Sequence, residues 1–273
     1  MKKAVAAVIV IAVVVLAVIY YLKQGQEATA PPQTRQISVP PARTEQEKAP
    51  AIKHPIYEIT VGAKQREMPS VRQEAIPTLD HSDGPVREAL TEFIDGKKLQ
   101  DSIIFKNIIR RFVVTVDNLT REKLPQNYRF VTDIPGKFDV DKSGGEDHYV
   151  LSDKNYHRYD ALVSLAEAVN LKQLVILYTR YYSLFQTAYE ELGYPHRYFN
   201  DRLVEVIGHL LAAPEPQGPI ELVQPKVFYQ FADPKLEKLS AGQKIMIRIG
   251  PDNERRVKDV LHKLLALLVK SKS

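Results

Sequence analysis

Histidine and carboxylate side chains are the groups in this 273-residue sequence that could hold a metal ion or transfer a proton. The seven histidines show neither the H-E-x-x-H pattern nor another close ligand spacing. The acidic residues around Gly144 and Gly145 lack the residue order of a calcium-binding loop. We therefore expect no metal and no cofactor. The scattered set His148, His157 and Asp160 leaves a hydrolase or transferase open as an alternative function.

Tyrosine is concentrated in one part of the chain, because nine of the fourteen tyrosines lie between Tyr149 and Tyr198. Tyrosines at helical spacing commonly pack a core and leave the hydroxyl at its edge. They can also line a groove that binds a peptide or a glycan strand, with Arg180 and Arg197 supplying charge. Both interpretations stay open from the sequence. In the second one, the candidate binding residues are Tyr156, Arg158, Tyr159, Tyr182 and Tyr194.

Two consecutive amphipathic helices are predicted to carry most of these tyrosines. Asn155 can cap the first helix, and Asn170 breaks it. The second continues to about Leu192, where Gly193 is well placed as a left-handed stop. Its apolar seam predicts the packing spine of the domain and contains Leu174, Tyr178, Tyr181 and Phe185.

The remaining patterns predict a mainly α, compact multi-helix domain with at most a small β-hairpin or sheet. Further helices are expected after Ser82 or Asp83, from about Lys98 to Val116, after a cap at Asn200, after a cap at Ser240, and from about Asp252. Alternation of Ile245, Ile247 and Ile249 leaves a strand as a second possibility after Ser240. Lys137–Leu151 is typical of a hairpin or loop, and Ile220–Phe231 is strand-like.

An apolar run close to the first residue predicts a membrane anchor. Ala4–Leu22 contains no charge, Gly or Pro and would span roughly 28 Å as a helix, close to the thickness of a bilayer's hydrocarbon core. A cleaved signal peptide is the alternative, but the run is longer than usual and the Ala28-x-Ala30 pattern lies well beyond it. Because Lys2 and Lys3 outweigh the later Lys23, we expect a cytoplasmic N-terminus and a periplasmic domain.

The chain divides into three parts on these grounds: residues 1–22 as the cytoplasmic end and anchor, 23–77 as a tether, and 78–273 as the folded domain. The tether is expected to be disordered because prolines recur along it and deny hydrogen-bond donors to regular structure. Ile52–Val61 is its one apolar interruption, where a short sticky segment or strand is the alternative.

Charge and cysteine content exclude several classes of protein. Residues 1–78 contain 10 Lys/Arg and 6 Asp/Glu, so the other 195 residues contain 28 and 27, a net charge of only +1. The basic excess lies outside the predicted domain, and we expect no nucleic-acid partner. The sequence has no cysteine, which excludes disulfides, thiolate metal sites and cysteine nucleophiles.

Five short motifs resemble an uncharacterised family of bacterial single-pass envelope proteins catalogued as a domain of unknown function. The motifs are RRFVVTVDNL (110–119), NYHRYDALV (155–163), AYEELGYP (188–195), FADPKLEKLSAGQK (231–244) and RIGPDN (248–253). The resemblance implies an inner-membrane protein with one span and a Pro-rich tether, and it implies no activity or catalytic residues.

These observations favour a membrane-tethered periplasmic module that binds an envelope protein or a glycan strand, and they leave enzymatic activity undecided. The alternative is an envelope hydrolase or transferase that uses the scattered residues described above. Self-association through an exposed helical face is a third possibility, so the oligomeric state is left open.

Overall fold

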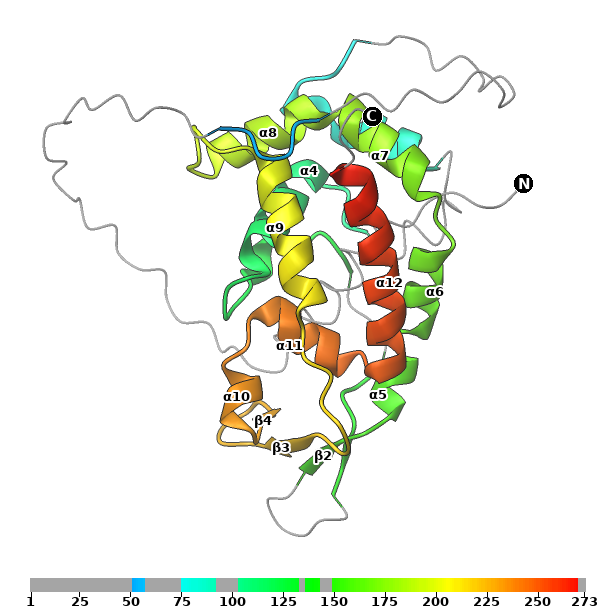
Figure 1. The fold of residues 1–273 in the computed structure, drawn as a ribbon, viewed down its shortest axis with the longest axis vertical. Coiled ribbons are helices and arrows are strands. Elements are labelled where there is room, and N and C mark those ends of the chain that lie inside the picture. The colour runs from blue at the N-terminus through cyan, green and yellow to red at the C-terminus, as the bar shows by residue number, and fades with distance from the viewer. Residues whose placement is uncertain (1–50, 57–74, 92–102, 133–135, 143–148, 270–273) are drawn as a thin grey trace, which may run out of the picture.

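The computed structural model describes residues 51–56, 75–91, 103–132, 136–142 and 149–269 of the chain. Within these residues the protein is mainly helical and carries a small antiparallel sheet at one end (Figure 1), as the sequence patterns predict. The expected membrane anchor at Ala4–Leu22 and most of the expected tether lie outside the described residues.

The longer helices are α4 (Ile108–Asn118), α7 (Leu171–Arg180), α8 (Tyr182–Glu191), α9 (Phe199–Leu211) and α12 (Pro251–Leu268). The shorter helices are η1 (Leu79–His81), α2 (Asp83–Thr91), η2 (Gln126–Tyr128), α5 (Lys154–His157), α6 (Asp160–Glu167), α10 (Pro234–Glu237) and α11 (Ala241–Arg248). Across the described ranges, no single helix is both long and apolar enough to cross a membrane, and α6 with α7 would be so only as a pair bent by 80°.

Helix α12 forms the centre of the domain and packs against α6, α7, α9 and α11. Figure 1 shows α9 and α12 running along the long axis, with α4, α7 and α8 at one end and the sheet at the other. Helix α4 contacts α8 and α9 and contributes Ile109, Val113 and Val116, which are at most 1% exposed. The core thus brings together helices that are far apart in the sequence, and each helix turns its apolar face toward it.

The sheet has the strand order β1-β2-β3-β4, and every pair is antiparallel. The strands are β1 (Val140–Asp141), β2 (Tyr149–Leu151), β3 (Glu221–Val223) and β4 (Gln230–Phe231). Leu222 pairs with Tyr149 on one side and with Phe231 on the other. A second, smaller cluster of buried residues covers the sheet: Leu151, Ile220, Leu222, Phe231 and Ile247. The hairpin expected within 137–151 is confirmed, and the strand-like segment at 220–231 forms two short strands, β3 and β4.

Helix α11 joins the sheet end of the domain to the helices, and all eight of its residues are buried. Ser240 caps it by accepting a hydrogen bond from the Gln243 amide, so the helical alternative for this segment is confirmed. The amides of Ala241 and Gly242 donate to the carbonyls of Arg121 and Leu119 at the end of α4. A Cβ atom at Gly242 would lie 2.8 Å from the Leu119 carbonyl oxygen, so glycine permits this close approach.

Two helix boundaries differ from the sequence expectation. Residues 98–102 of the helix expected from Lys98 lie outside the described residues, and the described part begins at Ile108, because Asn107 is left-handed (φ 55°) and Ile103 pairs with Val131. The helix expected to run on to Leu192 is interrupted at Tyr181, which separates α7 from α8.

Asn155 and Asn200 are the other departures, because neither caps a helix as predicted. The Asn155 side chain instead bonds both the amide and the carbonyl of Asp139, and it lies within α5, not before it. Asn200 is the second residue of α9. By contrast, Asn170 caps α7 by accepting hydrogen bonds from the Lys172 and Gln173 amides.

Candidate functional site

A short piece of the predicted tether, residues 51–56, lies against the first turn of α9 (the blue segment in Figure 1). The Asp201 carboxylate accepts the Lys53 amide at 3.1 Å through one oxygen and the His54 amide at 2.6 Å through the other. The Asn200 side-chain amide donates to the His54 carbonyl at 2.8 Å. Three backbone groups are therefore bonded by two adjacent side chains, which we call the α9 docking site.

The docked segment is bent at Lys53 and His54. In a straight strand successive amides point to opposite sides, so one carboxylate could not accept both. The bend turns two neighbouring N–H groups toward the same anion, an arrangement that proteins use to bind negative charge. Hydrogen bonds of this type, with an ionised acceptor, are among the stronger ones in proteins. The site thus recognises a backbone shape independently of most side chains.

Asn200 is held in place from behind by two tyrosines of α7 and α8. Asn200 is 1% exposed, and its side-chain oxygen accepts a hydrogen bond from the Tyr178 hydroxyl at 3.2 Å. That bond leaves the Asn200 amide nitrogen to face the docked segment. Burial raises the pKa of Tyr178 well above its ordinary value, and burial also raises the pKa of Tyr182. Both hydroxyls therefore keep their protons at neutral pH, and Tyr178 remains a donor.

Gln186 organises the turn that leads into α9. Its side-chain oxygen accepts the Phe199 amide at 2.9 Å and the Tyr182 hydroxyl at 3.1 Å, while its nitrogen donates to the Arg197 carbonyl. The first turn of α9 is thereby tied to α8. This connection fixes the direction in which Asn200 and Asp201 project.

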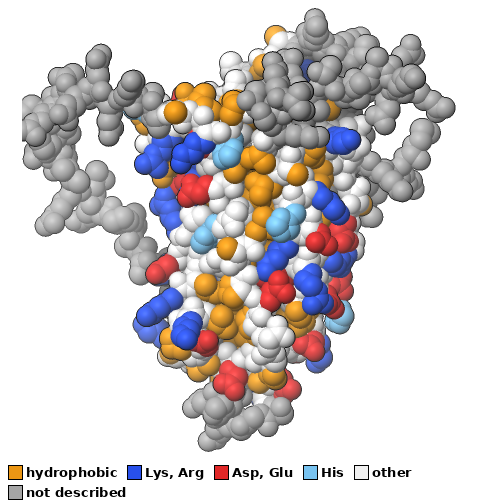
Figure 2. Space-filling model, in the orientation of Figure 1, with side chains coloured by type: hydrophobic (Ala, Val, Ile, Leu, Met, Phe, Trp, Pro, Cys, Tyr) orange, Lys and Arg blue, Asp and Glu red, His pale blue; other side chains and the backbone are white. Residues whose placement is uncertain are grey.

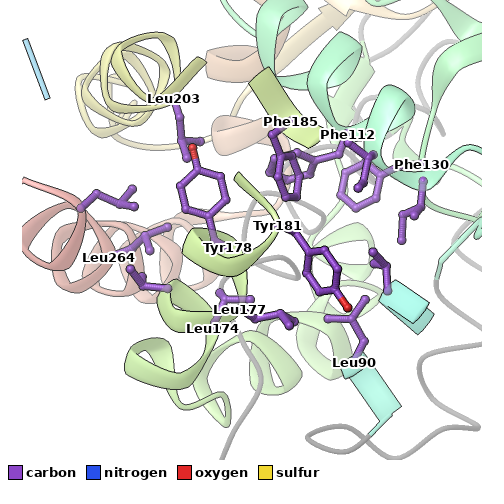
Figure 3. A pocket seen from close by; sticks show the side chains of 15 residues that line it. Leu90, Phe112, Phe130, Leu174, Leu177, Tyr178, Tyr181, Phe185, Leu203 and Leu264 are labelled. Carbon is purple, nitrogen blue, oxygen red and sulfur yellow. The ribbon is translucent and has the colours of Figure 1, made fainter. Parts of the chain in front are cut away.

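An apolar pocket of about 60 Å³ adjoins the site and is lined from α2, α4, α7, α8, α9 and α12. Figure 3 shows the rings of Tyr178 and Tyr181 on its wall, together with Phe112, Phe130 and Phe185. The pocket is smaller than the ~150 Å³ cavity that admits benzene in an engineered protein, so it has room for a small aliphatic group only. Because Tyr178 also bonds Asn200, its ring connects the pocket to the α9 docking site.

The five binding residues predicted from the sequence are not brought to one surface. Tyr182 lies beside the α9 docking site and Tyr194 lies at the end of α4, whereas Tyr156, Arg158 and Tyr159 belong to the α5 region at the other end of the domain (Figure 1). Tyr159 is 3% exposed and is part of the core, which corrects its place in a groove. The core interpretation therefore holds for that tyrosine, which directly precedes α6.

Tyr156 and Arg158 have architectural contacts. The Tyr156 ring packs over Gly250, and its carbonyl accepts a hydrogen bond from the Asn253 side chain at 3.0 Å. Arg158 donates to the Gly136 carbonyl at 3.2 Å. These contacts join α5 to the start of α12 and to the loop before β1.

Tyr194 belongs to a charge network around the buried Asp117 at the end of α4. Its hydroxyl donates to Asp117 at 3.3 Å, and its ring stacks on Tyr189 with 4.7 Å between centroids. Asp117 is 2% exposed and bonds both Arg202 and Arg121, at 3.0 and 2.8 Å. Burial, with Asp117 nearby, raises the pKa of Tyr189 to about 12. This network braces α4, α8 and α9 against one another.

The residues of the enzymatic alternative are partly described. His157 and Asp160 form a pair with 2.9 Å between Nδ1 and Oδ2, but the His157 side chain is 79% exposed. Burial alone would raise the pKa of Asp160, but the hydrogen bonds that Asp160 makes with His157 and Asn253 outweigh it and lower the pKa. His148 lies outside the described residues. Among the described residues, no group of three His, Asp or Glu side chains is arranged to hold a metal ion.

Comparison with known proteins places the chain in a family. The family described as "Protein of unknown function (DUF3014)" matches residues 108–265, more than half of the sequence. The chain belongs to this family. No curated protein and no solved structure matches the chain.

The five motifs that carry the DUF3014 resemblance meet one another in space. The 231–244 motif contacts the 110–119 motif where the Gly242 amide at the start of α11 donates to the Leu119 carbonyl at the end of α4. The 248–253 motif meets the 155–163 motif where Tyr156 covers Gly250, and the 188–195 motif reaches Asp117 through Tyr194. These motifs therefore contain residues that connect separate helices of the fold.

The α9 docking site was missed by sequence reasoning, although it lies inside the DUF3014 region. Asn200 was interpreted as a helix cap, and Asp201 carries no spacing signal of its own. The one available signal was the apolar interruption that begins at Ile52 in an otherwise polar tether. The docked segment itself precedes the DUF3014 region.

Proposed function

We propose that this DUF3014 protein is a membrane-anchored module of the bacterial envelope that binds a partner protein through the α9 docking site. In this proposal Ala4–Leu22 anchors the chain in the inner membrane, and the domain lies in the periplasm. The single observation that carries the binding role is the capture of two amides and one carbonyl by Asp201 and Asn200.

A protein partner fits this chemistry better than a glycan strand does. The carboxylate accepts two successive N–H groups while the neighbouring amide donates to the following C=O, and this order of groups is the order of a polypeptide backbone. A sugar ring offers hydroxyl groups without that fixed order. On the face shown in Figure 2, basic and acidic side chains are interspersed and do not gather in one patch. Recognition there would rest on local hydrogen bonds and not on a long-range field.

In-cell photo-crosslinking from the edge of the α9 docking site tests this function. Ser183 is exposed on α8 next to Tyr182, so a crosslinking amino acid at this position should capture the partner. We expect a protease-sensitive adduct that disappears when Asp201 is replaced by alanine, because the carboxylate that accepts hydrogen bonds from two backbone amides is lost. Glu205→Ala, an exposed carboxylate one turn further along α9, is the matched control and should keep the adduct.

A crosslinker at exposed Lys263 on α12 provides the control for position and should give no such adduct. An adduct that is insensitive to Asp201→Ala, or that forms equally from residues 183 and 263, would refute a role for the α9 docking site. An adduct removed by a glycan-cleaving enzyme and not by protease would assign the site to cell-wall glycan.

A further inference from the structure

We infer that the α9 docking site selects a short bent peptide in which two amide-bearing residues are followed by proline and then by an aliphatic residue, and that residues 53–56 are its resident ligand. This inference rests on the proposed function and names the ligand class and the regulation of the same site. A partner that presents the same turn would bind by displacing the chain's own segment.

The first two positions of the ligand are set by hydrogen bonds. Asp201 accepts N–H from Lys53 and from His54, so proline, which has no N–H, is excluded at both positions. The Lys53 side chain is exposed and His54 is half-buried. The site therefore restricts the backbone of these residues far more than their side-chain type.

Proline suits the third position for the complementary reason. Both Asp201 oxygens already accept the Lys53 and His54 amides, so the missing N–H of Pro55 costs no hydrogen bond to that carboxylate. Proline also restricts the backbone of the residue before it. The His54 carbonyl that Asn200 bonds is thus presented with less loss of conformational entropy than a freer residue would incur.

The fourth position is apolar. Ile56 is half-buried and packs against the main hydrophobic core, whereas Ile52, on the other side of the bend, is 46% exposed. A charged side chain in place of Ile56 would need to be desolvated against that core. The aliphatic position therefore lies after the proline and not before the bend.

Self-occupation follows from covalent attachment. The docked segment belongs to the same chain as its site, and a ligand attached in this way acts at an effective concentration on the order of millimolar. A free peptide sees only the fraction of molecules whose site is vacant, and its apparent affinity falls by that fraction. A partner must therefore bind tightly enough to compete with the resident segment at that effective concentration.

Fluorescence anisotropy with a labelled hexapeptide, AIKHPI, tests this inference on the full-length protein in detergent. Ile56→Asp should release the resident segment, and we expect it to bind the peptide at least about tenfold more tightly than the wild type does. Ile52→Asp places the same charge on the exposed side of the bend and should behave as the wild type. His54→Pro removes one docked amide without touching the core, and it should also expose the site.

Specificity is checked in the Ile56→Asp background. Adding Asp201→Ala should abolish peptide binding, and a peptide with proline in place of His54 should fail to bind. Equal peptide affinity for the wild type and for both exposed-site variants would overturn self-occupation. A wild-type dimer, seen by sedimentation and lost in Ile56→Asp, would show that the segment docks between copies, which also overturns it. Either result leaves the Asp201-dependent crosslink of the proposed function intact, whereas loss of that crosslink alone would refute the proposed function.

Discussion

Replacing Asp117 with alanine is expected to lower the free energy of unfolding by about 3–5 kcal/mol, because it leaves the largely buried Arg202 guanidinium without its carboxylate partner. Asp117 is 2% exposed, and its carboxylate bonds the Arg202 guanidinium at 3.0 Å and the Arg121 guanidinium at 2.8 Å. Arg202 also donates to the Asp117 carbonyl at 2.6 Å. Urea denaturation followed by circular dichroism measures the loss.

The matched control for this change is Asp80→Ala. Asp80 also pairs with an arginine, Arg110, at 2.7 Å, but its side chain is 73% exposed. Solvent screens that pair, so its removal should change stability by less than about 1 kcal/mol. Equal losses from the two variants would show that Asp117 is not the buried hub of the α4, α8 and α9 junction.

Replacing Gly250 with alanine is expected to be comparably damaging, by roughly 2–6 kcal/mol, through backbone strain and overpacking together. Gly250 has φ 89° and ψ 157°, a region that residues with a Cβ rarely adopt. An added Cβ would lie 2.4 Å from the Tyr156 ring. The joint between α11 and α12 would therefore have to open, and the same denaturation measurement would detect it.

Two further variants separate the causes at Gly250. Gly193 also has a positive φ, 106°, but no atom lies within 4 Å of an added Cβ, so Gly193→Ala should show only the conformational part, about 1–3 kcal/mol. Combining Gly250→Ala with Tyr156→Ala should destabilise less than the sum of the single changes, because the added Cβ has no ring to clash with in the double variant. Strict additivity would contradict the close packing of the ring on Gly250.

Much of the fold could be predicted because its helices carry local signals. Ser240 and Asn170 are strong capping residues followed by apolar periodicity, and α11 and α7 start where they indicate. The interruption at Tyr181 has no such signal, because Tyr178, Tyr181 and Phe185 continue the helical spacing across it. The turn between α7 and α8 is instead determined by tertiary packing around the apolar pocket, to which all three rings contribute.

The candidate site was harder to predict because its residues are ordinary in isolation. Asn200 and Asp201 could equally cap a helix, and only the structure shows that they face a segment 146 to 148 positions earlier in the chain. Tyr182, one of the predicted binding residues, accepts the Asn200 backbone amide through its hydroxyl, whereas Tyr178, which was assigned to the packing spine, bonds the Asn200 side chain. Sequence patterning detects periodicity along one element and contains no information about which elements meet.

Amide hydrogen exchange at Lys53 and His54 in the full-length protein tests most directly whether the α9 docking site binds backbone. We predict that both amides exchange at least about tenfold more slowly in the wild type than in Asp201→Ala, because the carboxylate holds both N–H groups. Glu205→Ala should leave that protection unchanged. Equally fast exchange in the wild type and in Asp201→Ala would contradict the capture of these two amides and, with it, the binding role assigned to the start of α9.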